Sequence, residues 1–200
     1  MWPVPVAFIG ANPCVTLLDD GTRTGFVSLW EAEWSVHGAG RAALVWRAGD
    51  AAVRLLTPDP RLGQWLAGTF SRHFPELDGL PDIAEPVDCE IAGWRVEVDT
   101  VRAELRGRDG STVAASIGGA LQTRPAHVPR GRLGYVPWTL TNLLTFCADA
   151  ALEIDGSRVP GAASVTTAGG RVQSSAFIAT HETWSHGDAS DGVSAGQLHT

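Results

Sequence analysis

The segment Leu29–His37 carries the densest group of side chains that could move protons. Alternate residues of a β-strand face the same side of a sheet, so Glu31, Glu33 and His37 share one face there. Two carboxylates and an imidazole facing a pocket could act as general acid and base, because burial raises the pKa of a glutamate. The alternative is a solvated outer face, with the tryptophans of the same strand in the core. We take these three residues as candidate catalytic groups.

Tryptophan is frequent in this chain, with eight among 200 residues. Most of these indoles are expected to pack in the core, but small-molecule sites are also lined by aromatic side chains with a few polar groups. Trp30, Trp34 and Trp94 are predicted to point toward such a pocket. Tyr135 and Trp138 are predicted to lie on a loop that could close its mouth.

Basic side chains gather in the segment 124–137, which is rich in proline and glycine and is predicted to be a long loop. Arg124 and His127, with Arg130, could bind a carboxylate of a ligand, because arginine offers a planar fork of donors. The alternative is a plain crossing connection. We add Arg124 and His127 to the candidate ligand-binding residues.

Two short motifs do not fit the geometry that their chemistry needs. The segment His181–His186 reads H-E-T-W-S-H, but a zinc-binding helix needs its histidines four residues apart, and here they are five apart. The segment Gly192–Gly196 matches G-x-S-x-G, but it lies in a polar C-terminal stretch with no buried strand before it. We therefore predict neither a metal site nor a nucleophilic serine.

The composition excludes several classes of enzyme. The chain has no lysine, which removes Walker A phosphate binding and Schiff-base chemistry. The formal net charge is −7, which argues against nucleic acid or an anionic membrane as a partner. We expect no cofactor and a small molecule as the partner, with a homodimer left open.

The three cysteines, Cys14, Cys89 and Cys147, are odd in number and far apart, and they form no C-x-x-C pair. They are predicted to be reduced, buried thiols of a cytoplasmic protein. The apolar N-terminal segment lacks the basic residues of a signal peptide, and no stretch approaches the roughly 20 apolar residues of a membrane span. A soluble, cytoplasmic protein is the expectation.

Five dipeptides that suit tight hairpin turns punctuate the sequence. They are Asp20-Gly21, Gly49-Asp50, Asp109-Gly110, Asp155-Gly156 and Gly169-Gly170. The segments around them have strand character and predict about eight to ten strands, at 13–19, 23–37, 42–46, 52–57, 89–106, 111–123, 146–154, 158–167 and 171–184. The segment 89–106 is either one bent strand or two. A straight strand of 15 residues would span about 50 Å, so long strands in a chain this size must bend around a barrel.

One helix is predicted between Asp59 and Phe74. Asp59 can cap it, Pro60 suits its first position, and apolar residues then recur every three or four residues. Pro75 ends it and begins a second loop, 75–86, which is either a functional lid or a plain crossing connection.

The predicted fold is therefore all-β: a single antiparallel barrel of about eight to ten strands over residues 1–185, with one short helix and a flexible polar tail at 186–200. In strand number and hairpin signals it resembles the calycin or lipocalin type of container. A barrel of this size can enclose a small ligand, so we expect the protein to bind a small, largely apolar molecule inside it. The protein would be a cofactor-free cyclase or isomerase of a biosynthetic pathway. The alternatives are a non-catalytic carrier and a Trp-rich module that assembles with its own copies.

Overall fold

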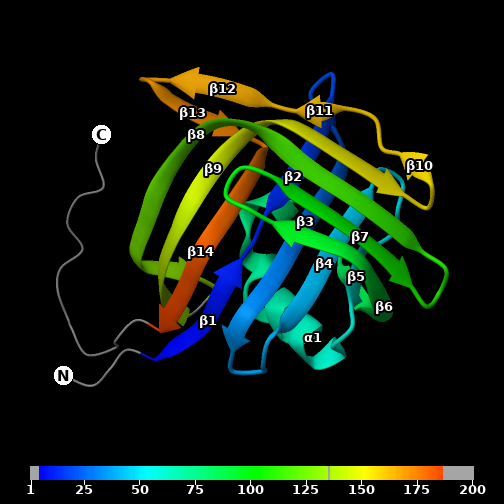
Figure 1. Ribbon diagram of the computed structural model, residues 1–200, viewed down its shortest axis with the longest axis horizontal. Helices are drawn as coiled ribbons and strands as arrows, with labels where there is room; N and C mark the ends of the chain where they lie inside the picture. Colours follow the sequence, from blue (N-terminus) through cyan, green and yellow to red (C-terminus); the bar gives the residue numbers. More distant parts are fainter. Residues whose placement is uncertain (1–4, 135, 187–200) are drawn as a thin grey trace.

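The computed structural model describes residues 5–134 and 136–186, and most of them lie in β-strands (Figure 1). One α-helix and two 3₁₀ turns interrupt the strands. The elements are β1 (Val6–Ala11), β2 (Cys14–Asp19), β3 (Thr22–Ser35), β4 (Gly40–Arg47), β5 (Val53–Thr57), α1 (Pro60–Thr69), η1 (Ser71–His73), η2 (Pro75–Leu77), β6 (Ile83–Val96), β7 (Val101–Gly107), β8 (Thr112–Leu133), β9 (Val136–Ile154), β10 (Ser157–Arg158), β11 (Ala162–Ala163), β12 (Val165–Ala168), β13 (Arg171–Ser174) and β14 (Ala176–His186).

The strand pairing closes on itself. Following hydrogen-bonded neighbours leads from β9 through β8, β7, β6, β5, β4, β3, β1 and β14, and β14 pairs with β9 again. Every pairing in this ring is antiparallel except β5 with β6, which is parallel because α1 and the 3₁₀ turns connect the two strands. The all-β class, the closed arrangement and the single short helix are confirmed, and the parallel pair departs from the expected antiparallel pattern.

All five predicted turns join paired strands. At Asp155-Gly156, for example, φ is positive at both residues (53° and 71°), as tight two-residue hairpin turns require. The segment 89–106, expected to be one bent strand or two, is two strands, β6 and β7. The strand β1 was not predicted.

The segment 124–137 is not the predicted loop. Its described part continues β8 to Leu133 and begins β9 at Val136, so the two form one long hairpin. The pairing of β7 with β8 stops at Ile117, so beyond that residue no strand among residues 5–134 and 136–186 pairs with β8 along that edge. Proline is tolerated on an edge strand because its missing N–H is not needed there, which explains why Pro125 and Pro129 do not break it.

The space inside the ring is filled. One apolar cluster draws members from β14 and from every strand of β2–β9, so it occupies the space that these strands surround. Most of its members are small or branched aliphatic residues, among them Val27, Leu29, Val45, Leu105 and Ile154. The expectation of a hollow interior for an organic guest was wrong for the described part of the chain, because these side chains pack across the ring.

A second apolar cluster lies on the opposite face of the same strands, where α1 covers them (Figure 1). Along β3 the two clusters alternate, with Val27 and Leu29 inward and Phe26 and Trp30 toward the helix. Asp59 caps the helix as predicted, since its side chain accepts hydrogen bonds from the N–H groups of Arg61 and Leu62. This outer cluster holds most of the aromatic side chains.

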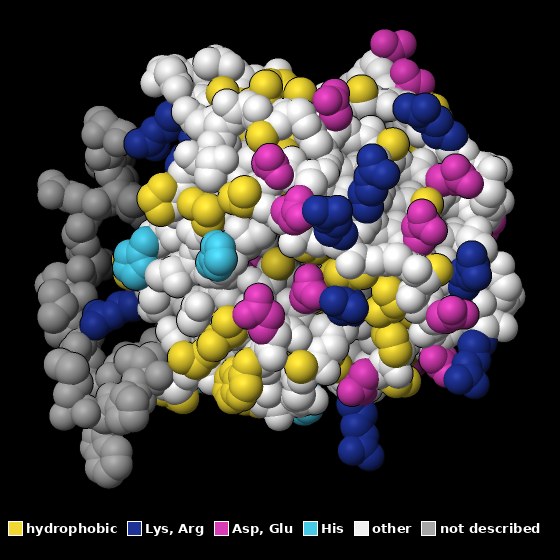
Figure 2. All heavy atoms as spheres, in the orientation of Figure 1, with side chains coloured by type: hydrophobic (Ala, Val, Ile, Leu, Met, Phe, Trp, Pro, Cys, Tyr) yellow, Lys and Arg dark blue, Asp and Glu magenta, His cyan; other side chains and the backbone are white. Residues whose placement is uncertain are grey.

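On the face shown in Figure 2, arginine and acidic side chains are interspersed rather than gathered by sign. All three cysteines are buried and unbridged, as predicted. No helix among residues 5–134 and 136–186 is long and apolar enough to cross a membrane. The predicted tail, apart from His186, lies outside the described residues, and so does the G-x-S-x-G match.

Candidate functional site

A cavity of about 380 Å³ lies between the 3₁₀ turns that follow α1 and the strands β9 and β14. It is on the outer, helix-covered face of the sheet, not inside the ring. Most of the surface of its wall is apolar, although six of the fourteen lining residues have polar side chains. The lining residues are Asn12, Phe74, Pro75, Glu76, Leu140, Asn142, Leu144, Phe146, Gln173, Ser174, Phe177, Ala179, Glu182 and Trp184.

An aromatic stack forms one wall of this cavity. The ring of Phe74 lies between the indoles of Trp30 and Trp184, with centroid distances of 5.8 Å and 6.0 Å and near-parallel planes. Phe70 packs against both indoles from α1's C-terminal end. Phe74 immediately precedes η2, and Pro75 and Glu76 of η2 line the cavity on the side opposite the sheet. The aromatic stack therefore holds η2 in place over the cavity.

A β-bulge in β14 turns Glu182 into the cavity. Phe177 and Ala179 line it, so strict alternation would place residue 181 there next. Instead the register with β9 shifts between Thr180 and Thr183, and His181 takes a positive φ of 51°. The shift moves Glu182 and Trp184 to the cavity face, which is a known use of bulges.

The carboxyl group of Glu182 is buried in this apolar setting, with 2% of the residue exposed. Burial disfavours the charged form and raises the pKa of Glu182 to about 7, although a hydrogen bond from the Trp184 indole lowers it in part. The second carboxylate oxygen, Oε2, is buried without a hydrogen-bond partner in the described chain. Glu182 can therefore exchange a proton near neutral pH.

A second carboxyl group stands at the same cavity. Burial raises the pKa of Glu76, and the neighbouring charge of Asp78 adds to that, while its own backbone N–H and Arg23 lower it. Arg23 holds this turn by donating from Nη1 to the carbonyl oxygens of Glu76 (3.2 Å) and Asp78 (3.1 Å). The site thus has two carboxyl groups whose environments favour the neutral acid.

Two asparagines are also part of the polar lining, with Gln173 and Ser174. Asn12 is fully engaged in the fold, since its Nδ2 donates to Ser28 Oγ (2.9 Å) and to the Leu29 carbonyl (3.1 Å). By contrast, the Oδ1 atom of Asn142 is buried with no partner among the residues described. Buried polar atoms without partners are uncommon, and two of them belong to residues that line this cavity.

Glu31 is not at this site. Its Oε1 accepts hydrogen bonds from Arg41 Nη2 (2.7 Å) and Nε (3.1 Å), and its Oε2 accepts one from Trp94 Nε1 (3.1 Å). Arg41 also lies over the Trp94 ring, 5.5 Å from its centroid. Both oxygens are therefore committed to a contact between β3 and β6, which is a structural role.

The other two candidate catalytic residues are exposed. Glu33 is the extra residue of a bulge where β1 pairs with β3, and with Glu31 and His181 it borders a small hollow of about 160 Å³. His37 lies beyond the end of β3, with its ring 5.1 Å from that of Trp65. The structure therefore brings Glu31 and Glu33 together but leaves His37 elsewhere.

The bulge at Glu33 also separates the two tryptophans predicted to share a face. Trp30 is fully buried in the aromatic stack, whereas Trp34, beyond the bulge, is 46% exposed. Trp30 lines none of the cavities found among the described residues. The predicted common face for Trp30 and Trp34 was wrong, because the extra residue reverses the alternation.

Trp94 and Trp138 are packing residues in the structure. Trp94 lies against the cluster inside the ring and donates to Glu31. Trp138 is 3% exposed, with its ring 5.2 Å from Phe70 and 6.1 Å from Trp184, so it supports the cavity wall from behind. It lies on β9 and not on the predicted loop.

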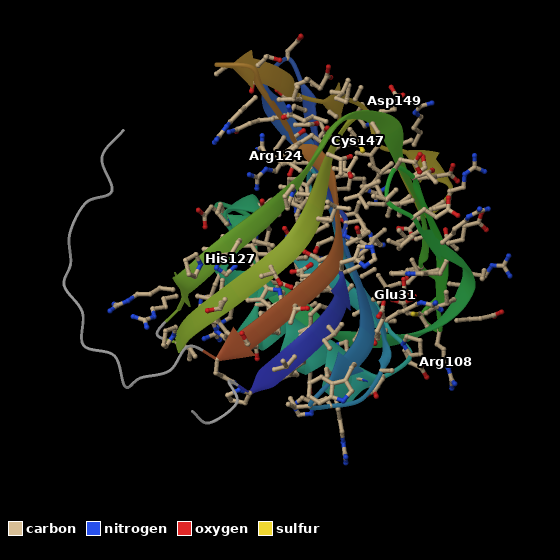
Figure 3. The ribbon with its side chains drawn as sticks, turned by 60° about the vertical axis from the view of Figure 1, so that its left-hand side comes forward. Glu31, Arg108, Arg124, His127, Cys147 and Asp149 are labelled. Carbon is tan, nitrogen blue, oxygen red and sulfur yellow. The ribbon has the colours of Figure 1, made fainter. Side chains whose placement is uncertain are left out.

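Arg124 reaches the edge of the cavity, and His127 does not. The guanidinium carbon of Arg124 lies 4.5 Å from the ring centroid of Phe146, a cavity residue. His127 is exposed on the other face of β8, and Figure 3 shows both residues along this strand, well apart from Glu31. Tyr135 lies outside the described residues.

Sequence reasoning missed Glu182 because the segment His181–His186 was considered only as a metal motif. Within residues 5–134 and 136–186, no group of three or more histidine, cysteine or acidic side chains could hold a metal ion. One signal was present: Glu182 and Trp184 are two residues apart, so any strand that buries the indole also turns the carboxyl inward.

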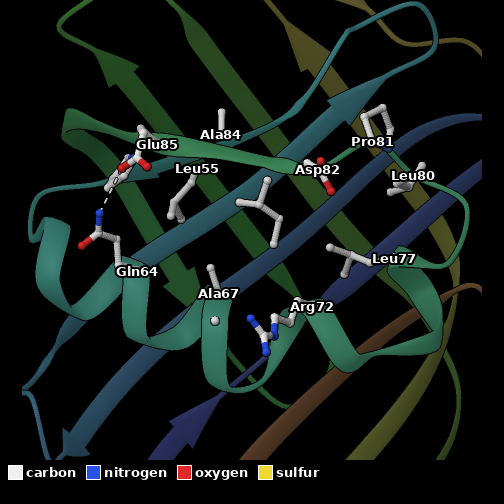
Figure 4. Close-up of a pocket in the computed structure, with 13 residues that line it drawn as sticks. Leu55, Gln64, Ala67, Arg72, Leu77, Leu80, Pro81, Asp82, Ala84 and Glu85 are labelled. Carbon is white, nitrogen blue, oxygen red and sulfur yellow. Dashed lines mark hydrogen bonds between the residues drawn. The ribbon is translucent and has the colours of Figure 1, made fainter. Parts of the chain in front are cut away.

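A second hollow, of about 440 Å³, lies between α1 and the start of β6 (Figure 4). Gln64 Nε2 donates to Glu85 Oε2 (3.0 Å) across one end of it. Its lining includes the exposed Arg72 and no buried polar atom that lacks a partner in the described chain. It is the larger of the two hollows, but the carboxyl groups whose pKa is raised by burial line the other one.

The chain was compared with protein families, curated proteins and solved structures. No protein-family model and no curated protein matches the sequence. Among solved structures, the chain is similar to an acetoacetate decarboxylase from Legionella pneumophila, with 12% sequence identity over 92% of this chain and 85% of that chain. The TM-score is 0.36, and at that level the likeness carries no argument about this chain.

Proposed function

We propose that this protein binds a small, largely apolar organic molecule in the cavity between η2, β9 and β14, and that Glu182 transfers a proton to or from it. The observation that carries the proposal is the buried carboxyl group of Glu182, whose pKa is about 7, at the wall of an apolar cavity. Strongly shifted carboxyl groups in clefts are typical of general acids and bases.

The chemistry best suited to this arrangement is a cofactor-free isomerisation or cyclisation. In its ionised form, Glu182 would take a proton from a carbon next to a carbonyl group and return it at another carbon of the same molecule. A pKa near the working pH serves both half-steps, because the group must be a base first and an acid afterwards. Side chains of the aromatic wall would hold the substrate in a reactive shape.

A non-catalytic carrier would use the same cavity without the proton transfer. A panel of β,γ-unsaturated ketones distinguishes the two, because their conversion to conjugated isomers changes the ultraviolet absorption. The enzyme hypothesis predicts conversion by the wild-type protein and a loss of about 10² or more in Glu182→Gln. Binding without conversion across the panel supports the carrier instead.

The cavity itself is tested with a neutral fluorescent guest, N-phenylnaphthylamine, whose emission rises in an apolar site. Saturable binding is expected in the wild type. Leu144→Trp, which adds an indole at the cavity wall, should abolish binding. The matched control is Leu143→Trp, because the neighbouring residue carries the same side chain on the opposite face of β9. Equal binding by both variants would remove the cavity from the proposal.

The Trp-rich assembly module has one observation in its favour. Trp34 is 46% exposed beside Ile9, its partner across β1 and β3, which is 36% exposed. Trp30, Trp138 and Trp184, in contrast, are buried within one chain. Light scattering on a sizing column checks this alternative: a monomer removes it, and a dimer that Trp34→Ser dissociates supports it.

A further inference from the structure

Arg124 lies at the edge of this cavity, against one of the residues that line it. Its guanidinium lies over the face of Phe146, whose ring is part of the cavity wall. The side chain is half-buried, and it is held in place by two hydrogen bonds from Nη1, to Gln122 Oε1 (3.1 Å) and to the Val172 carbonyl (3.4 Å). Its orientation is therefore fixed before any ligand arrives.

The charge of Arg124 has no counter-ion in the described part of the chain. Both acceptors of Nη1 are neutral amide oxygens, and no described carboxylate lies within ion-pair distance. Among the same residues, neither Nε nor Nη2 donates a hydrogen bond, so one edge of the fork is unused. Five other arginines have acidic partners, namely Arg41, Arg47, Arg54, Arg95 and Arg108.

The strand register places this fork on the cavity side of the β8–β9 hairpin. Arg124 is opposite Leu144, and Gln122 is opposite Phe146. Directly opposed residues in antiparallel strands share a face, and both Leu144 and Phe146 line the cavity. Gln173, next to the Val172 carbonyl that Arg124 binds, also lines it.

We propose that Arg124 binds the carboxylate of the substrate, and that the substrate is an apolar monocarboxylic acid. This inference rests on the proposed function, since it concerns the same cavity. The apolar body would lie against Phe146 and Phe74, and the reacting end would lie against the deeply buried Glu182. A single guanidinium balances one negative charge, and its paired Nε and Nη2 donors match the two oxygens of a carboxylate.

The test compares two probes that differ only in charge: phenylbutanoate and its primary amide. Titration calorimetry near pH 6 is suitable, because Glu182 is then mostly protonated and does not repel the anion. The wild type should bind the acid about tenfold or more tightly than the amide. Arg124→Gln should remove that preference by weakening the binding of the acid far more than the binding of the amide, and Arg124→Lys should restore only part of the preference, because lysine keeps the charge but not the fork.

The matched control is Arg132→Gln, an exposed arginine farther along β8, which should keep the preference for the acid. Thermal melting of each variant verifies that it is folded. If the wild type binds the acid no more tightly than the amide, or if Arg124→Gln keeps the preference, the inference is overturned. Binding of N-phenylnaphthylamine separates this failure from a failure of the proposed function. If that neutral guest still binds, the cavity remains a ligand site and only the role of Arg124 is overturned.

Discussion

The indole Nε1 of Trp184 donates a hydrogen bond to Oε1 of Glu182, two residues before it on β14. The two side chains share the cavity face because the bulge at His181 precedes both of them. Burial raises the pKa of the carboxyl group and this hydrogen bond lowers it, so the value of about 7 is a balance between the two.

Replacing Trp184 with phenylalanine should raise the pKa of Glu182 above 7. The variant keeps an aromatic ring in the stack but removes the donor that stabilises the charged form. A carbon-13 NMR titration of the glutamate side-chain carboxyl groups measures the change. Trp138→Phe is the control, because Trp138 packs against Trp184 without bonding to Glu182. An unchanged or lowered pKa in Trp184→Phe would contradict the assigned role of the indole.

The stability of the fold should fall as the pH rises from about 4.5 to about 7. In the unfolded chain Glu182 ionises near its ordinary pKa of 4.5, whereas in the folded chain it keeps its proton to about 7. The folded state binds more protons in that window, so raising the pH favours unfolding, by about 3 kcal/mol in total for this group. Burial of Glu76 acts in the same direction.

Urea unfolding at several pH values between these limits measures that dependence. In Glu182→Gln most of the slope should disappear, because the amide does not titrate. A wild-type protein whose stability is flat or rises across this window would show that Glu182 is ionised in the folded state.

Glu31→Gln should destabilise the fold by about 1 kcal/mol, because it removes an ion pair with Arg41 that is partly exposed to solvent. It should not change binding of N-phenylnaphthylamine, since Glu31 lies outside the cavity. Thermal melting and fluorescence titration measure the two effects. Glu33→Gln, on the exposed bulge, is the comparison that should change neither quantity. If Glu31→Gln no longer bound N-phenylnaphthylamine, Glu31 would again be a candidate residue of the site.

Trp30→Ala should cost about 3–5 kcal/mol of unfolding free energy, as expected for a large aromatic side chain removed from a core. Trp34→Ala should cost less than about 1 kcal/mol, because its side chain is nearly half exposed. Both changes remove a tryptophan from the same strand, four residues apart. The difference between the two losses of unfolding free energy therefore reports how deeply each side chain is buried. Similar losses in the two variants would contradict the separation that the Glu33 bulge creates.

Much of the fold could be predicted because it depends on local signals. Turn dipeptides such as Asp20-Gly21 and the cap at Asp59 act within a few residues, and the structure has hairpins and a helix at those places. The long hairpin of β8 and β9 could not be predicted in full, because Pro125 and Pro129 look like loop residues until the free edge of β8 is known. That edge depends on where a different strand ends.

The candidate site was harder to predict, because two bulges decide it. Strict alternation places Trp34 beside Trp30 and turns Glu182 away from Ala179, and one extra residue in each strand reverses both assignments. A bulge depends on how neighbouring strands fit together, so the sequence of one strand does not reveal it. Arg124 was selected for its donor geometry, and the structure brings it to the cavity edge on a strand instead of a loop.

The affinity for a neutral guest, measured at pH 6 and at pH 8, tests the account most directly. If the cavity accepts a small apolar molecule against protonated Glu182, the affinity of the wild type for N-phenylnaphthylamine should fall about tenfold over that range, as the carboxyl group ionises. The affinity of Glu182→Gln should stay constant. No saturable binding, or an equal wild-type affinity at both pH values, would contradict a ligand site built around this carboxyl group.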